Sequence, residues 1–246
     1  MGKISLIAKN NAGYKNLLKL SSSSYLSIEK NEDPHCDIQE LIDNSEGLIV
    51  LLGASRSLLS TLILENNISD SEILLQKIQK SFKNNVYLEI QRHNESHEQA
   101  LESQLLNFSE KLSIPIIATH EVFYLKKDMY EAHDALICIG RKTYINDKTR
   151  KRYSDQHYLK SNLEMAELFS DLPEALENNY NFPLRCNFRP SFSNPILPNI
   201  SSEKGGNADD ILRKDSLHGL KIKFDKIFKI KNNELDNNKI FLEYKD

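Results

Sequence analysis

Two stretches of this sequence carry side chains that could bind a metal ion or move a proton at the point where a strand ends. Residues 86–93 (VYLEIQRH) predict a strand finishing at His93, and residues 114–124 (IPIIATHEVFY) predict a second one with His120 and Glu121 near its end. The amphipathic stretch 97–112 between them completes a βαβ unit, whose strand ends face one rim. Because imidazole and carboxylate groups together suit zinc or a hard cation, the pattern indicates a candidate site there.

Other histidines near this rim have simpler explanations. His93 and His97 flank Glu95 in the order HxExH, which differs from the HExxH order of helical zinc sites. The residues between them indicate a strand-to-helix connection, so we interpret His97 as a solvated residue of a first helical turn. His133 lies on a predicted helix, where a surface or packing role is commoner than ligation. No HxH pair occurs, although two-metal phosphoesterases commonly use one.

A basic, irregular loop is expected at residues 141–152. Its basic residues are Arg141, Lys142, Lys148, Arg150, Lys151 and Arg152, accompanied by Tyr144 and Tyr153. Such a loop could contact phosphates, but most such loops are solvated surface, and the tyrosines favour nucleic acid only slightly. The sequence has no Walker loop, GxGxxG, GxSxG or catalytic Cys/His signature.

Strand and helix patterns alternate along most of the chain. We expect strands at 4–8, 47–53, 86–91 and 115–119, and helices at 14–25, 56–65, 70–82, 97–112, 128–139, 162–169, 173–180 and 209–228. Ser69 or Asp70 should cap the helix at 70–82. Such alternation predicts an α/β fold with a parallel sheet or barrel and right-handed crossovers.

Composition sets the class of protein. The 246 residues are 39% apolar and 27% charged with a net charge of −3, which indicates a globular protein without a global basic field. That charge neither shows nor excludes DNA binding. Cys36, Cys138 and Cys186 are odd in number and far apart, which favours a reducing compartment, so we predict a cytoplasmic protein. No apolar run approaches the roughly 20 residues that span a bilayer, so we expect no membrane partner.

Several strings of this sequence resemble the bacterial DNA polymerase III alpha subunit, a replicative polymerase of the C family. They are residues 6–17 (LIAKNNAGYKNL), 46–51 (EGLIVL), 87–93 (YLEIQRH), 114–119 (IPIIAT), 133–139 (HDALICI) and 158–178 (YLKSNLEMAELFSDLPEALEN). Each string alone is moderately specific. Their order and spacing across residues 4–200 carry the resemblance.

The resemblance implies a domain organisation. Residues 1–183 would be the later part of a polymerase-and-histidinol-phosphatase (PHP) domain, an incomplete, irregular βα barrel. Residues 184–208 would form a proline-containing linker, and 209–246 the truncated, helical start of the polymerase core or palm. The family's opening strands with their HxH ligands, and the palm aspartates that hold two magnesium ions, would then be missing. A barrel without its first strands leaves an open edge, which predicts marginal folding or aggregation.

The same resemblance assigns the candidate site residues. His93 matches a metal-ligand position of relatives whose PHP site is intact, whereas Glu121 stands where they carry Asp and Phe123 where they carry His. Phe cannot coordinate a metal, and the longer Glu side chain displaces its carboxylate. The resemblance therefore implies a degenerate site in which His93 and Glu121 are residual ligands for zinc or manganese, and it assigns no catalytic residue to this chain.

Three hypotheses of function follow. In the first, the chain is a fragment of the alpha subunit that belongs to DNA-templated DNA synthesis in chromosomal replication but lacks the catalytic palm residues. The full-length family uses magnesium, while we expect no cofactor in this chain, polymerase III subunits as partners, and DNA contact only through the missing core. In the second, the chain is a non-catalytic docking module for a proofreading exonuclease or the rest of the polymerase. In the third, it is a degenerate metal-dependent phosphoesterase.

Overall fold

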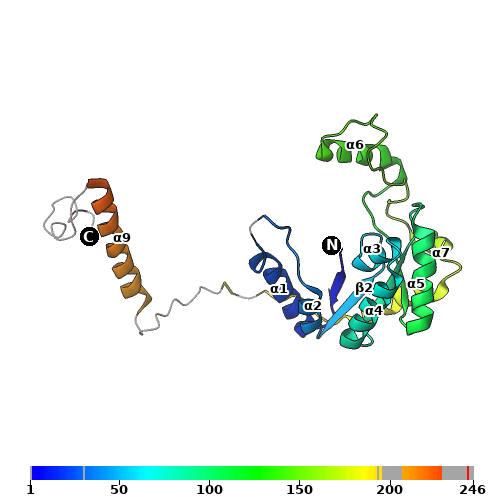
Figure 1. Cartoon of the computed structure of the whole chain (residues 1–246), viewed down its shortest axis with the longest axis horizontal. Helices are drawn as coiled ribbons and strands as arrows, with labels where there is room; N and C mark the ends of the chain where they lie inside the picture. The colour runs from blue at the N-terminus through cyan, green and yellow to red at the C-terminus, as the bar shows by residue number, and fades with distance from the viewer. Residues whose placement is uncertain (1, 30, 193, 196–206, 229–242, 244–246) are drawn as a thin grey trace. The chain divides into compact units, whose positions relative to one another are not determined.

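The computed structural model describes residues 2–29, 31–192, 194, 195, 207–228 and 243. The chain divides into two compact units, Met1–Arg189 and Pro190–Asp246. Unit 1 contains the sheet and most of the helices, and unit 2 contains helix α9 (Ala208–Phe228), as Figure 1 shows.

A four-stranded sheet forms the centre of unit 1. Its strands are β1 (Ser5–Ala8), β2 (Leu48–Leu52), β3 (Val86–Gln91) and β4 (Ile116–Thr119), in that spatial order. The neighbours β2 and β3 are parallel, as are β3 and β4, so the parallel pairing expected for these three strands is confirmed. The sheet is open, as in an incomplete βα barrel.

The expectation of a parallel sheet is wrong for β1, which runs antiparallel to β2. The end of β1 at Ala8 lies opposite the start of β2 at Leu48, so the intervening chain returns to the same end of the sheet. Two glycines permit this return. A Cβ atom on Gly13 would lie 1.9 Å from the carbonyl oxygen of Gly47, and Gly47 itself has φ of +70°.

Helices cover the sheet and connect its strands. They are α1 (Asn11–Leu26), α2 (Ile38–Asp43), α3 (Leu58–Leu64), α4 (Ile68–Phe82), α5 (Glu98–Leu112), α6 (Tyr130–Arg141), α7 (Asn162–Leu168) and α8 (Pro173–Asn181), with short 3₁₀ turns η1 (Lys127–Met129) and η2 (Pro183–Arg185). The expected strands and helices are thus confirmed to within a few residues at their ends. Two details differ: Asn67 is the N-cap residue of α4, and residues 120–123 follow β4 as irregular chain.

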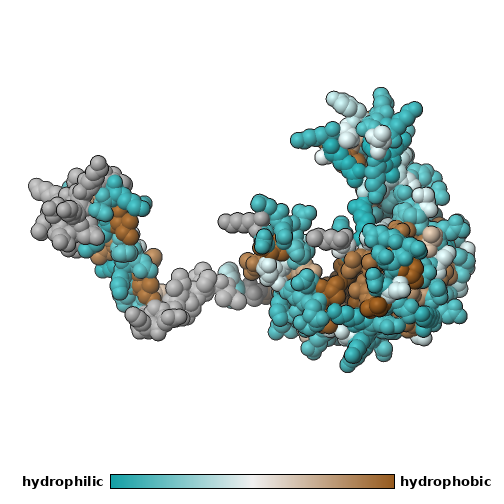
Figure 2. Space-filling model, viewed as in Figure 1, coloured by the Kyte–Doolittle hydropathy of each residue, from teal (hydrophilic) through white to brown (hydrophobic). Residues whose placement is uncertain are grey.

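The main hydrophobic core lies on one face of the sheet. Leu48, Val50, Leu52, Leu88 and Ile90 from the strands pack there with apolar residues of α1, α3, α4, α5 and α8. In α5 the buried residues Leu101, Leu105 and Phe108 follow the helical repeat. Figure 2 shows hydrophobic side chains gathered around β2, between the helices that flank it. This core fixes where β3 and β4 end, and therefore positions the candidate site.

The other face of the sheet carries a smaller cluster of Ile49, Leu51, Tyr87 and Ile117. The segment after α8 packs here, because Phe182 meets Tyr87 edge-on at 5.4 Å between ring centroids and Arg185 donates a 2.6 Å hydrogen bond to the Tyr87 hydroxyl. Residue Phe188 then stacks on Tyr14 of α1. Residues 182–188 therefore belong structurally to unit 1.

The two edges of the sheet differ. At β4, Asn178 and Asn179 of α8 donate side-chain hydrogen bonds of 2.8 and 2.5 Å to the carbonyl oxygens of Ile116 and Ala118. These amides occupy acceptors that a further strand would otherwise use. At β1, no strand pairs with the outer edge within the described residues. Marginal folding or aggregation of the chain stays a prediction.

Unit 2 is described only in part. The helix expected at 209–228 is confirmed as α9, in which Phe224 is buried and packs with Leu217 and Leu220. Residues 196–206, which fall in the expected linker, and most of the polar tail after Phe228 lie outside the described residues. Within the described ranges, no helix is long and apolar enough to cross a membrane.

Candidate functional site

His93 lies two residues beyond Gln91, the last residue of β3, and its side chain is only 1% exposed. Its Nδ1 atom is 2.9 Å from Oε1 of Glu98, and its backbone N–H donates to both carboxylate oxygens of that residue at 2.9 and 2.8 Å. Glu98 is the first residue of α5, where a carboxylate also suits the partial positive charge of a helix N-terminus. The helix start therefore holds the histidine in place.

The other ring nitrogen of His93 is also engaged. The backbone N–H of Glu121 donates a 3.0 Å hydrogen bond to Nε2, which makes Nε2 the acceptor and places the proton on Nδ1, facing Glu98. Burial raises the pKa of the Glu98 carboxyl, but hydrogen bonds from His93 and Glu95 outweigh it and hold that pKa below its usual range. In this arrangement His93 has no free nitrogen for a metal ion.

Five aromatic rings form a stack around His93, which we call the ring stack: His120, His93, His157, Phe123 and His133. Successive centroids are 4.4, 4.2, 4.6 and 5.2 Å apart, and the planes of each pair lie within 27° of parallel. Tyr153 meets the Phe123 ring edge-on at 4.9 Å. The loop after β4, the start of α6 and the segment around residue 157 are thereby packed together.

Two histidines of the ring stack, His120 and His157, have pKa values below the usual range. Burial, His93 and Lys160 lower the pKa of His120 to about 4, and burial together with His93 lowers the pKa of His157. His120 Nε2–H donates to the carbonyl of Gln156 at 2.9 Å, and His157 Nδ1–H donates to the carbonyl of Glu121 at 3.0 Å. Each therefore uses its one N–H as a donor to the backbone.

The remaining nitrogens do not converge on a metal site. His120 Nδ1 and His157 Nε2 are buried without a hydrogen-bond partner, but the His93 ring lies between those two residues in the stack. His157 Nε2 is 3.6 Å from Oε1 of Glu95, beyond hydrogen-bond distance. Within the described part of the chain, no group of three His, Cys, Asp or Glu side chains could hold a metal ion. The residues present do not fit a metal centre.

The residues that the sequence placed at the site, His93, Glu121 and Phe123, lie close together in or beside the ring stack. His93 and Glu121 are neighbours, but their contact is a hydrogen bond from the Glu121 backbone, and Phe123 fills a place within the ring stack. The expectation from sequence that His93 and Glu121 bind a metal ion is not tested by this geometry. His97 is the N-cap residue of α5, and the packing role expected for His133 is confirmed by its contacts with Phe123 and Tyr124.

Sequence reasoning missed Glu98 and His157. A signal for Glu98 existed, since an acidic residue in the first turn after a strand-ending histidine can reach back to its ring. His157 lies far along the chain, in a segment without a motif, and nothing local marked it.

An arginine clamp beside the site was also missed. Arg92 precedes His93 and donates hydrogen bonds to Glu102 of α5, to Asp171 and to the carbonyl of Leu168 in α7, at 2.9, 2.6 and 2.6 Å. Its guanidinium also lies over the Phe169 ring at 4.8 Å. The clamp ties β3 to α5 and to the segment that ends α7.

Comparison with known proteins identifies the ancestry of this fold. Residues 1–93 match the PHP domain family. The chain is 37% identical over 227 residues to DNA polymerase III subunit alpha of Rickettsia bellii, covering 92% of this chain and 19% of that protein. It is 37% identical over 235 residues to the Rickettsia conorii protein of that name (96% and 20%), and 34% identical over 221 residues to the one from Pseudomonas aeruginosa (89% and 19%).

The chain therefore spans about a fifth of the length of these relatives. The similarity runs through both strand ends of the candidate site, since it covers nearly the whole chain. Taken with the open sheet and the site at the ends of β3 and β4, it shows that the chain contains a PHP domain and is homologous to the N-terminal region of DNA polymerase III subunit alpha.

Proposed function

We propose that this chain serves in chromosomal DNA replication as the PHP-containing part of a polymerase III alpha subunit and does not itself transfer nucleotides. The observation that carries the proposal is the similarity to subunit alpha along 92% of the chain. Polymerases transfer nucleotides with two metal ions held by acidic residues, and no motif identified in this sequence supplies such a pair. The ring stack supports a structural role, because both ring nitrogens of His93 and one ring nitrogen each of His120 and His157 form hydrogen bonds within the protein.

Primer extension by the purified chain tests this proposal. With magnesium, a primed template and all four nucleotides, we expect synthesis no higher than that of a blank. A full-length subunit alpha in the same assay is the positive control. Robust, metal-dependent synthesis by this chain alone would contradict the proposal.

A second candidate function is a docking module for a proofreading exonuclease or for the rest of the polymerase. The favouring observation is a set of large apolar side chains that unit 1 leaves exposed around α6, including Leu136 at 64% and Ile139 at 75%. Exposed apolar residues that gather on one element are typical of interaction surfaces.

Co-purification tests the docking role. The chain is mixed with the purified exonuclease subunit, or with the remainder of the polymerase expressed separately, and the mixtures are analysed by size exclusion. A complex with either protein supports docking. A folded chain that elutes alone from both mixtures refutes it.

A further inference from the structure

Helix α6 and the loop after it form a projection, which we call the α6 lobe (residues 130–153). Asp134 of α6 and Arg150 of the loop form a paired ion contact whose side chains are only 7% and 4% exposed, with one N–O distance of 2.6 Å. The hydrogen bonds from Arg150 lower the pKa of Asp134, and the Tyr130 hydroxyl donates to the carbonyl of Tyr153 at 3.0 Å. The loop is therefore pinned to its helix.

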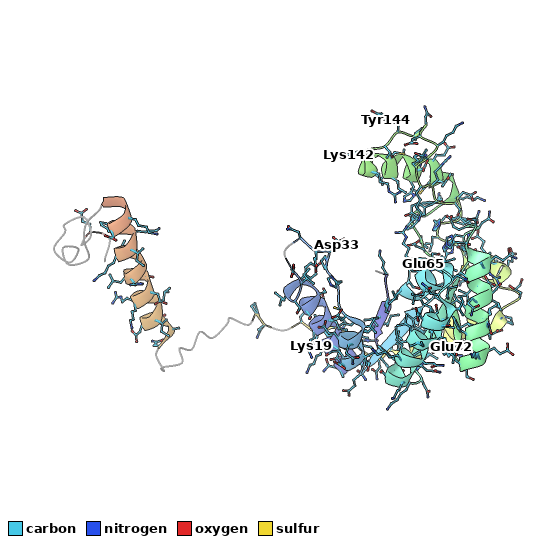
Figure 3. The ribbon with its side chains drawn as sticks, viewed as in Figure 1. Lys19, Asp33, Glu65, Glu72, Lys142 and Tyr144 are labelled. Carbon is cyan, nitrogen blue, oxygen red and sulfur yellow. The ribbon has the colours of Figure 1, made fainter. Side chains whose placement is uncertain are left out.

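Although these contacts hold the loop to α6, large apolar side chains of the lobe are exposed to solvent. Leu136, Ile139, Tyr144 and Ile145 are 64, 75, 85 and 55% exposed. An open groove of about 470 Å³ lies between α6 and the loop, with Ile139, Tyr144 and Ile145 in its lining. Figure 1 shows α6 standing apart from the sheet, and Figure 3 places Lys142 and Tyr144 at the outer part of the lobe.

The loop beside this apolar groove is rich in basic residues. Residues 141–153 contain six basic side chains and one acidic side chain, Asp147. Arg150 is engaged by Asp134, and Arg152 lies 3.4 Å from the same carboxylate. Arg141, Lys142, Lys148 and Lys151 are exposed, and Lys142 also lines the groove. The lobe therefore combines an apolar groove with a basic loop, residues 141–153, which we call the basic rim.

We propose that the α6 lobe binds an acidic, amphipathic protein segment, whose apolar side chains enter the groove while its carboxylates face the basic rim. Burial of aliphatic side chains against other aliphatic groups is favourable. The phosphates of a nucleic acid cannot provide such groups. Three of the four exposed side chains are aliphatic, and Tyr144 alone could stack on a base. The balance of groups thus favours a protein over a single-stranded nucleic acid.

This inference rests on the docking role proposed above and names its surface and the chemistry of the partner. A direct probe is a fluorescein-labelled helical peptide with leucines on one face and glutamates on the other, titrated with the full chain. A matched peptide carries lysines in place of the glutamates. We expect micromolar binding of the acidic peptide, weakened by salt, and at least tenfold weaker binding of the basic one.

Matched variants locate the binding surface. Ile139→Asp should weaken binding of the acidic peptide at least tenfold, whereas Ile73→Asp, on α4 and 62% exposed, should change it less than twofold. Tyr144→Ala should weaken it about fivefold, whereas Tyr180→Ala, at 80% exposed, should not. Equal effects of lobe and control variants, or equal binding of both peptides, overturn the inference. A thymidine oligonucleotide that displaces the acidic peptide is the nucleic-acid outcome and also overturns it.

The two proposals fail in distinguishable ways. If the exonuclease or the polymerase remainder binds wild type and Ile139→Asp equally, docking stands and the lobe is not its surface. If neither protein binds the chain but the acidic peptide binds the lobe with the expected variant pattern, the lobe inference stands and the docking role fails.

Discussion

In the ring stack, near the ends of β3 and β4, His93, His120 and His157 form hydrogen bonds within the protein, whereas the α6 lobe leaves aliphatic side chains exposed to water. His93 is 1% exposed and bonded at both ring nitrogens, while Ile139 is 75% exposed. The ring nitrogens of His93 are thus both engaged within the protein, and in the ring stack only His120 Nδ1 and His157 Nε2 are buried without a partner among the described residues. The α6 lobe, which carries no recognised functional motif, is the region whose apolar side chains are exposed.

The comparison suggests that burial and satisfaction of hydrogen bonds, rather than residue type, separate structural from interacting regions here. A buried polar group costs free energy unless it is paired, so the hydrogen bonds of His93, His120 and His157 help to hold the ring stack in this arrangement. An exposed apolar group, by contrast, is in an unfavourable contact with water that a partner could remove. The following experiments test each half of this contrast.

The largest effect is expected at Glu98, which accepts hydrogen bonds from the ring and backbone of His93 and from the backbone of Glu95. Glu98→Ala leaves those buried donors unpaired and should lower the free energy of unfolding by about 3 kcal/mol. Urea denaturation followed by circular dichroism measures the loss. Glu110→Ala, at an exposed position of the same helix, is the control. A loss at Glu98 no larger than the control's would show that the ring stack does not depend on this carboxylate.

Acid should weaken unit 1 next most strongly. The pKa of His120 is about 4 in the fold against an ordinary 6.5, so between these values the unfolded chain takes up a proton that the folded chain does not. Stability is therefore complete above pH 6.5 and falls as the pH drops toward 4, by roughly 2 kcal/mol.

Urea midpoints measured across this pH range check the slope. His120→Asn should flatten it, while His218→Gln in unit 2 should leave it unchanged. A wild-type slope that His120→Asn does not alter would assign the acid sensitivity to other groups.

A smaller and local effect is expected in the α6 lobe. Asp134→Asn weakens the buried ion pair with Arg150, so the loop should detach from α6 more often. Amide hydrogen exchange in residues 130–153 should become about tenfold faster, with β3 unchanged. Asp128→Asn, at an exposed position just before α6, is the matched control. Faster exchange throughout unit 1 would mean that the lobe and the sheet are one cooperative unit.

The smallest effect is expected from metal ions. Because His93 offers no free nitrogen, a tenfold excess of zinc or manganese should shift the thermal midpoint by less than about 1 °C. Glu121→Gln keeps the backbone N–H that faces His93 and should respond in the same way. One tightly bound ion per wild-type chain, lost in Glu121→Gln, would instead establish the pair as ligands.

The sequence by itself determined the local elements and the ancestry. Apolar repeats such as Leu101, Leu105 and Phe108 indicate a helix because one face must be buried, and that signal lies within a few turns of chain. The strings shared with subunit alpha required no structure at all. Placing His93 at a strand end was also a local inference, and it is correct.

Only the tertiary structure decided what the site residues do. The antiparallel direction of β1, the stacking of His157 on His93 and the backbone bond from Glu121 all join segments far apart in sequence. Their geometry follows from how the core packs the strands and loops together, and single-sequence patterns carry no information on such distant contacts. The same holds for the α6 lobe, whose apolar residues look like core in the sequence and are exposed because no other described element covers them.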